Sequence, residues 1–257
     1  MQRLTYGSYL HVPELLSLQR PLSSPPHHDE MLFIIIHQVY ELWFKELLHE
    51  LQAVLKSLQS DQLLKTAKEF SRIHTIQRLL EAQVDILETM TPQEFNAFRD
   101  NLRPASGFQS LQFREIEFLG GLKETEALKH LETSPEEKAR LERRLNEATL
   151  SAELYALLRR RGFAVETHDE RIESLKKIYE QSEHYYDLYL LLEDLMEFDE
   201  RFLLWRSRHI LMVERMIGSK MGTGGSLGVT YLAKTLNRKF FPELWEVRTH
   251  LGSDVYG

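Results

Sequence analysis

Cysteine is absent from the 257 residues of this chain. Disulfide bonds, zinc–thiolate sites, iron–sulfur clusters and thiolate-ligated haem are therefore excluded. Any metal that the chain binds must be held by His, Asp, Glu, Tyr or Met side chains.

Long hydrophobic runs are also missing. The longest apolar stretch, residues 31–36, is far too short to cross a bilayer. The first residues lack the apolar segment of a secretory signal peptide. We therefore expect a cytoplasmic protein with no membrane partner.

The chain has no excess of positive charge. It carries 32 Lys and Arg residues against 39 Asp and Glu residues, which gives a formal net charge of -7. A nucleic-acid partner would require a basic face, so we expect none. Hydrophobic residues make up 42% of the chain and charged residues 28%, which is enough for a sizeable core and a solvated surface.

Helical patterns dominate what is present. A long helix is predicted to open at Asp29, because apolar residues recur at helical spacing from Leu32 to Leu58, and further long helices are predicted over 61–90 and 187–217. Capping-box sequences begin at Thr91 and at Ser134. We predict an all-α fold, in which one domain (1–257) forms a bundle of long helices that can enclose a cofactor.

The section at about 122–178 is highly charged and predicts a helical hairpin inserted into this domain. One amphipathic helix is expected to follow Ser134 and to end at the arginines 159–161, before Gly162. The arginines fit a solvated surface that complements the helix dipole better than a binding patch.

Two histidines lie in apolar surroundings. The helical neighbours of His209 at three, four and seven positions are Phe202, Trp205, Met212, Val213 and Met216. His37 follows the apolar run 33–36. A neutral imidazole in an apolar slot suits haem ligation or one hydrogen bond to a ligand. Spacing alone, however, favours two ordinary core histidines.

A candidate substrate-binding pair lies on the helix that begins after Thr91. Phe95 and Arg99 are four residues apart and share a face. Arginine is suited to bidentate capture of a carboxylate, although a surface arginine is the commoner case. The glycine-rich loop 218–228, which includes Thr223, lacks the order of a phosphate-binding loop and fits a lid or a linker.

In its order of motifs, the sequence resembles the tryptophan 2,3-dioxygenase family. The resemblance rests on residues 4–10 (LTYGSYL), 28–43 (HDEMLFIIIHQVYELW), 104–110 (PASGFQS), 205–209 (WRSRH), 222–226 (GTGGS) and 240–250 (FFPELWEVRTH). It covers essentially the whole chain apart from the charged middle section.

The resemblance implies a haem b, one per subunit, in an enzyme that opens the indole ring of L-tryptophan with O2 to give N-formyl-L-kynurenine, and it implies a homotetramer. His209 falls on the iron ligand, and Ser106 lies close to the haem. His37 falls on the catalytic residue that binds the indole N–H. The implied substrate-binding residues are Phe33, Ile34, Ile35, Ile36, His37, Phe95, Arg99 and Thr223, together with Tyr6, Tyr9 and Leu10, which reach into a neighbouring subunit.

The sequence departs from the family pattern at two positions. Leu227 stands where relatives usually carry a second serine, and Phe95 stands where some relatives carry a tyrosine. Three other functions stay open: a haem-based oxygen sensor or carrier, a dioxygenase for a substituted indole, and a helical interaction module without a cofactor. A sensor or carrier has no need for Arg99 and Thr223 together.

Overall fold

The computed structural model describes residues 3–125, 133–223 and 235–252. These residues are organised as helices joined by turns, with no strand among them, which confirms the predicted all-α fold. Residues 224–234, which include Leu227 and the second half of the glycine-rich loop, lie outside the described residues. After them, the short turn η4 (Thr235–Asn237) is described.

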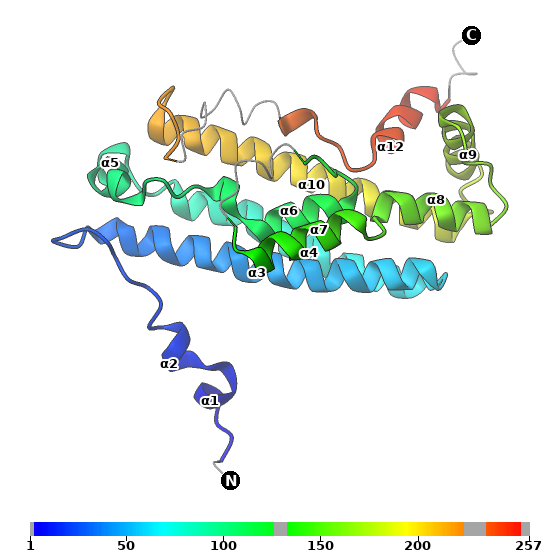
Figure 1. The fold of residues 1–257 in the computed structure, drawn as a ribbon. Coiled ribbons are helices and arrows are strands. Elements are labelled where there is room, and N and C mark those ends of the chain that lie inside the picture. The colour runs from blue at the N-terminus through cyan, green and yellow to red at the C-terminus, as the bar shows by residue number, and fades with distance from the viewer. Residues whose placement is uncertain (1–2, 126–132, 224–234, 253–257) are drawn as a thin grey trace.

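Three long helices form the body of the molecule and run side by side (Figure 1). They are α3 (His28–Gln59), α4 (Leu63–Leu87) and α10 (Tyr186–Ile217). Helix α4 packs along both α3 and α10. The three helices were expected because their apolar residues repeat at helical spacing, and the expectation is confirmed.

Shorter helices cover this body. They are α5 (Pro92–Arg99), α6 (Leu111–Gly120), α7 (Pro135–Asn146), α8 (Leu150–Arg160), α9 (His168–Glu180) and α12 (Pro242–Glu246). The turns η1 (Asp100–Leu102), η2 (Gly107–Gln109) and η5 (Val247–His250) complete the order. Thr91 and Ser134 each form the predicted capping box at the start of α5 and α7.

The single helix expected after Ser134 was wrong, because the chain forms two helices there. Helix α7 ends at Asn146, and the backbone of Glu147 is extended. Thr149 then caps a new helix, since its hydroxyl accepts a hydrogen bond from the amide of Ala152 at 3.0 Å. The local preference of threonine for a cap therefore outweighs the continuous amphipathic pattern.

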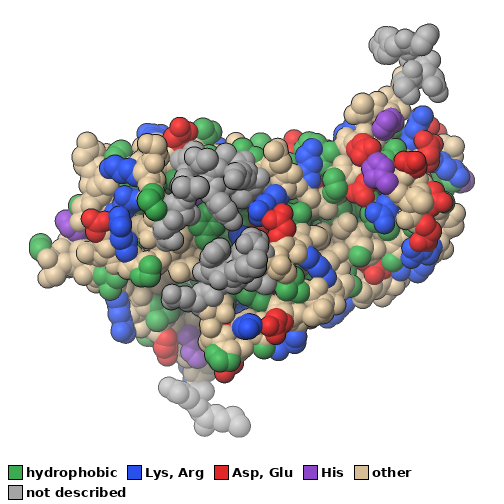
Figure 2. Space-filling model, turned by 45° about the horizontal axis from the view of Figure 1, so that its top comes forward, with side chains coloured by type: hydrophobic (Ala, Val, Ile, Leu, Met, Phe, Trp, Pro, Cys, Tyr) green, Lys and Arg blue, Asp and Glu red, His purple; other side chains and the backbone are tan. Residues whose placement is uncertain are grey.

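The arginines at the end of α8 form ion pairs, as expected for a solvated surface. Arg161 binds both carboxylate oxygens of Asp61 at 2.7 Å, and Arg159 pairs with Glu166 at 2.7 Å. Arg160 donates to the carbonyl of Leu58 at the end of α3. Figure 2 shows acidic and basic side chains interspersed over the visible face of the molecule.

The N-terminal segment projects away from the bundle in Figure 1. It contains the short helices α1 (Tyr6–Leu10) and α2 (Val12–Leu15), neither of which buries a residue. Large apolar side chains remain exposed on this segment, with Tyr6 79% and Tyr9 68% accessible.

A buried carboxylate fixes the C-terminal segment to α10. Asp199 is fully buried and accepts hydrogen bonds from the amides of Phe240 and Phe241, both at 3.0 Å. The indole N–H of Trp245 donates to the same carboxylate at 3.1 Å. Burial raises the pKa of Asp199, while these three donors act in the opposite direction.

We expect Asp199→Ala to lower the free energy of unfolding by about 3 kcal/mol, because three buried N–H groups lose their acceptor. Urea unfolding followed by circular dichroism measures the change. The control is Asp85→Ala, which removes an exposed partner of Arg208 and should change stability by less than about 1 kcal/mol. Equal losses in the two variants would contradict this role of Asp199.

Candidate active site

A cavity of about 290 Å³ lies inside the bundle, enclosed by α3, α4, α5, α6 and α10. Its volume is near the lower end of the range for small-molecule sites. Most of the wall is apolar or aromatic, and a few polar groups converge on it. The lining residues are Phe33, His37, Tyr40, Glu41, Phe44, Val84, Leu87, Met90, Phe95, Arg99, Ser106, Gly107, Phe108, Ser110, Phe113, Arg114, Glu117, Trp205, Arg206, His209, Met212, Val213, Met216, Ile217, Gly222 and Thr223.

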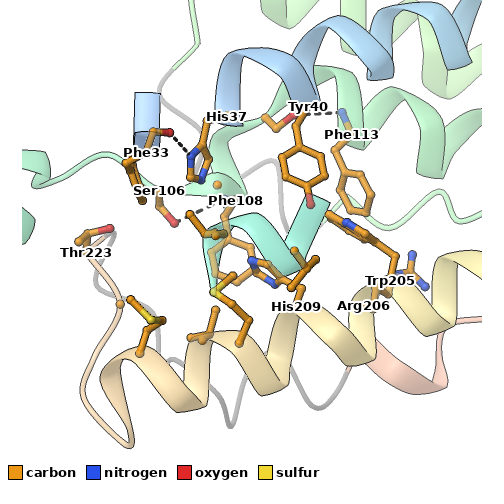
Figure 3. A pocket seen from close by; sticks show the side chains of 18 of the residues that line it. Phe33, His37, Tyr40, Ser106, Phe108, Phe113, Trp205, Arg206, His209 and Thr223 are labelled. Atoms are coloured by element: carbon orange, nitrogen blue, oxygen red, sulfur yellow. Dashed lines mark hydrogen bonds between the residues drawn. The ribbon is translucent and has the colours of Figure 1, made fainter. Parts of the chain in front are cut away.

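Two histidines enter the cavity from opposite walls. His37 points into it from α3, and His209 points into it from α10 (Figure 3). Helical periodicity places each ring one turn from an aromatic residue, Phe33 before His37 and Trp205 before His209. Helices α3 and α10 thus each place one imidazole ring at the same apolar cavity, on opposite sides.

The local hydrogen bond of His37 determines which nitrogen faces the cavity as an acceptor. Its Nδ1 lies 2.7 Å from the carbonyl oxygen of Phe33, an acceptor that requires a proton on Nδ1. Burial lowers the pKa of His37 and favours the neutral ring. In that tautomer Nε2 is unprotonated, so it can accept one hydrogen bond from a ligand.

His209 is neutral and available as a ligand. Burial, with a smaller contribution from His37, lowers the pKa of His209 to about 4. Among the described residues, no side chain or carbonyl forms a hydrogen bond with its ring. The indole of Trp205 stacks on the imidazole, with centroids 5.7 Å apart and planes inclined by 17°. An unprotonated imidazole without a protein partner is the form that binds a metal.

Phe33 and Phe95 form an aromatic end of the cavity beside His37, and the buried ring of Phe98 packs behind them. The rings of Phe33 and Phe95 stack at 5.7 Å, and Phe98 contacts both rings edge-on at 5.7 and 5.5 Å. Phe33 also lies 4.1 Å from the His37 ring. This arrangement suits a flat, apolar ring that carries one hydrogen-bond donor.

Polar groups lie next to this aromatic end. Arg99 is only 7% exposed, and its Nη2 donates to the carbonyl of Met221. Its Nε is buried without a hydrogen-bond partner in the described part of the chain. The hydroxyl of Thr223 donates to the carbonyl of Ala105 at 2.6 Å. A partly unsatisfied guanidinium beside an apolar slot is suited to a carboxylate.

A second charged group lines the wall formed by α6 and α10. Glu117 pairs with Arg114 at 2.6 Å and with Arg206 at 3.1 Å, and all three side chains are buried. The guanidinium of Arg206 also donates to the carbonyl of Arg238 at 2.8 Å. The Nε of Arg114 has no partner within the described residues. These guanidinium groups can donate further hydrogen bonds to anionic oxygens of a bound molecule.

The structure brings together seven of the predicted site residues. Phe33, His37, Phe95, Arg99, Ser106, His209 and Thr223 all line the cavity. Ser106 caps η2, where its hydroxyl accepts a hydrogen bond from the amide of Phe108 at 3.4 Å.

The other predicted residues lie elsewhere. Ile34, Ile35 and Ile36 are not among the lining residues: Ile36 packs with Phe98 and Met212 around the cavity, and Ile35 is 43% exposed. Tyr6, Tyr9 and Leu10 lie on the projecting N-terminal segment.

Several lining residues were not predicted, above all Arg114, Glu117, Tyr40 and Phe113. Arg114 and Glu117 are three residues apart on α6, and this ion-pair spacing was a readable signal. Tyr40 lies one turn after His37 on the same face of α3. Nothing in the sequence indicated that α6 packs beside α3.

Metal donors are sparse among the described residues. They contain no cluster of three or more His, Asp or Glu side chains that could hold an ion. None of the described helices is long and apolar enough to cross a membrane.

The fold and the cavity define a helical-bundle protein that binds small molecules between its helices, with one free imidazole and one buried guanidinium in the same space. The model of one family, described as tryptophan 2,3-dioxygenase, matches residues 1–172 and 134–251. The chain belongs to this family.

Curated relatives are similar over nearly the whole chain. A tryptophan 2,3-dioxygenase of Nocardioides sp. is 49% identical and aligns with 97% of this chain and 95% of its own length. Those of Myxococcus xanthus and Xanthomonas euvesicatoria are each 46% identical. The alignments cover 97% and 98% of this chain and 90% and 89% of those relatives.

Proposed function

We propose that this chain is a haem-dependent enzyme that inserts both atoms of O2 across the C2–C3 bond of the L-tryptophan indole and forms N-formyl-L-kynurenine. The observation that carries the proposal is one cavity lined by His209, His37 and Arg99 in a member of this family. The haem supplies the oxygen chemistry when bound. The protein supplies ligation, orientation and an apolar enclosure.

The residues of the cavity fit a haem. The neutral, unpartnered His209 is the proposed iron ligand, and Ser106 is proposed to lie close to the haem. The buried cations Arg114 and Arg206 on the wall can pair with the carboxylate groups of the haem. The apolar residues Met212, Val213 and Met216 on α10 supply the surface against which a flat macrocycle can pack.

The remaining groups match an indole-bearing amino acid. Phe33 and Phe95 supply the slot for the ring, and Nε2 of His37 accepts the indole N–H. Arg99 pairs with the carboxylate, and the hydroxyl of Thr223 supplies an acceptor for the ammonium group. A site that pairs each polar group of its substrate rejects analogues that lack one of them.

We extend the proposal to the assembly and to the domain. The exposed apolar side chains of Tyr6, Tyr9 and Leu10 are proposed to complete the site of a neighbouring subunit in a homotetramer. The chain is proposed to form one domain, since residues of α8 and α9 share the main core with α3 and α10. We also propose a cytoplasmic location.

The direct test is a steady-state assay of the haem-loaded protein with L-tryptophan and O2. We expect one N-formylkynurenine per O2 consumed, followed by absorbance and mass spectrometry. Label from ¹⁸O2 should appear at both new oxygen atoms. If the haem-loaded protein consumes no tryptophan, the proposed reaction is wrong, and a haem-based oxygen sensor or carrier is favoured.

His209→Ala should lose most of its haem, because the variant lacks the side chain proposed to bind the iron. The Soret absorbance after haem supplementation and desalting measures the loading. The matched control is His49→Ala, which changes an exposed histidine on α3 and should load as the unaltered chain does. Normal loading and an unchanged spectrum in His209→Ala would exclude His209 as the ligand.

Replacement of Arg99 should weaken tryptophan binding in a graded way. We expect Arg99→Lys to raise KM about tenfold, since the charge stays but the bidentate geometry is lost, and Arg99→Ala to raise it about a hundredfold. Arg103→Ala serves as the control, because Arg103 is exposed and pairs only with Asp100 at 3.3 Å among the described residues. An unchanged KM in Arg99→Ala would refute the carboxylate contact.

His37→Ala should slow turnover without abolishing it, because it removes one neutral hydrogen bond and no required base. The expected loss in kcat/KM is about five- to tenfold. The same substitution should have little effect with 1-methyl-L-tryptophan, which has no indole N–H. Equal losses with both substrates would show that His37 acts in some other way.

A further inference from the structure

We infer that Trp205 is a positioning residue that fixes the rotation of the His209 ring through stacking. The inference rests on the proposed role of His209 as the iron ligand and deepens it. Trp205 precedes His209 by four residues on α10, so the two side chains lie on the same face of the helix. Their centroids are 5.7 Å apart, and their planes are nearly parallel at 17°.

The need for such a residue follows from the torsions of histidine. The terminal torsion of His has broad minima, so the side chain itself does not fix the plane of the ring. Metal-binding histidines are usually oriented by a hydrogen bond from the second ring nitrogen. In the described part of the chain, no residue makes such a bond to His209. The indole of Trp205 is the flat surface against which this ring rests.

The indole can act in this way because it is itself held in place. Phe113 of α6 lies 5.2 Å from it, and Phe44 of α3 contacts it edge-on at 6.2 Å. Tyr40 adds an edge contact at 6.1 Å. Figure 3 shows Tyr40 and Phe113 beside Trp205. Aromatic contacts from two other helices thus prevent the indole from turning with the imidazole.

Tyr40 is fixed in turn by α4. Its hydroxyl donates to the carbonyl of Leu80 at 2.9 Å, and burial raises the pKa of Tyr40 to about 12, so the hydroxyl keeps its proton. The indole N–H of Trp205 lies next to this hydroxyl but does not meet hydrogen-bond geometry with any described residue. The surrounding rings and this neighbouring hydroxyl therefore hold the indole in place.

The experiment compares three substitutions in the full-length, haem-loaded protein. Trp205→Phe keeps an aromatic plane beside His209, and Trp205→Leu removes it. Phe198→Leu is the matched control, because Phe198 is a fully buried ring of α10 that packs on Phe202 and Phe240 and does not line the cavity. The readouts are the iron–histidine stretching band in resonance Raman spectra of the ferrous protein, kcat and KM.

We expect Trp205→Leu to broaden or split the iron–histidine band and to lower kcat about tenfold, with KM changed less than about twofold. Trp205→Phe should restore a single band and come within about threefold of the original kcat. Phe198→Leu should lower stability and leave the band unchanged. If Trp205→Leu does not load haem, Trp205→Met tests the loss of the plane with an unbranched side chain.

Two results would overturn the inference. One is an unchanged band in the variants that lack an aromatic ring. The other is a Trp205→Phe variant as impaired as Trp205→Leu, which would assign the effect to the indole N–H. Failure of the proposed function is a separate outcome, because it appears as normal haem loading in His209→Ala, whatever the Trp205 variants do.

Discussion

The packing of α3 and α10 along the two sides of α4 is the constraint on which the site depends. These helices carry His37 and His209, and their common core keeps the two imidazoles on opposite walls of one cavity. Because the interior is closely packed, neither helix can shift without opening voids between the leucine and phenylalanine side chains that join them. The packing of the core therefore sets the distance between His37 and His209 across the cavity.

Buried polar groups join other parts of the chain to these helices. Asp199 binds the C-terminal segment to α10, and Glu117 links the arginines of α6 and α10. Each of these carboxylates is satisfied by several N–H groups, which offsets the cost of burying its charge. Both lie on elements that border the cavity, so the polar network and the site share one framework.

Burial also determines the chemical state of the site. Desolvation by the apolar wall lowers the pKa of both histidines, and the carbonyl of Phe33 selects the tautomer of His37. Within the described residues, the Nε groups of Arg99 and Arg114 have no hydrogen-bond partner. A cavity with such guanidinium groups suits a ligand that carries a carboxylate.

The sequence by itself determined the helices, their caps and the family. Apolar spacing predicted α3, α4 and α10, and local hydrogen bonds predicted the starts of α5 and α7, because these signals depend only on residues a few positions apart. The break at Thr149 was missed because two local preferences competed there. Only the tertiary structure decided that Trp205 faces His209 with Phe113 behind it and that Arg114 and Glu117 border the same cavity. Those contacts join residues up to about a hundred positions apart, and the packing of whole helices, which no local pattern encodes, brings them together.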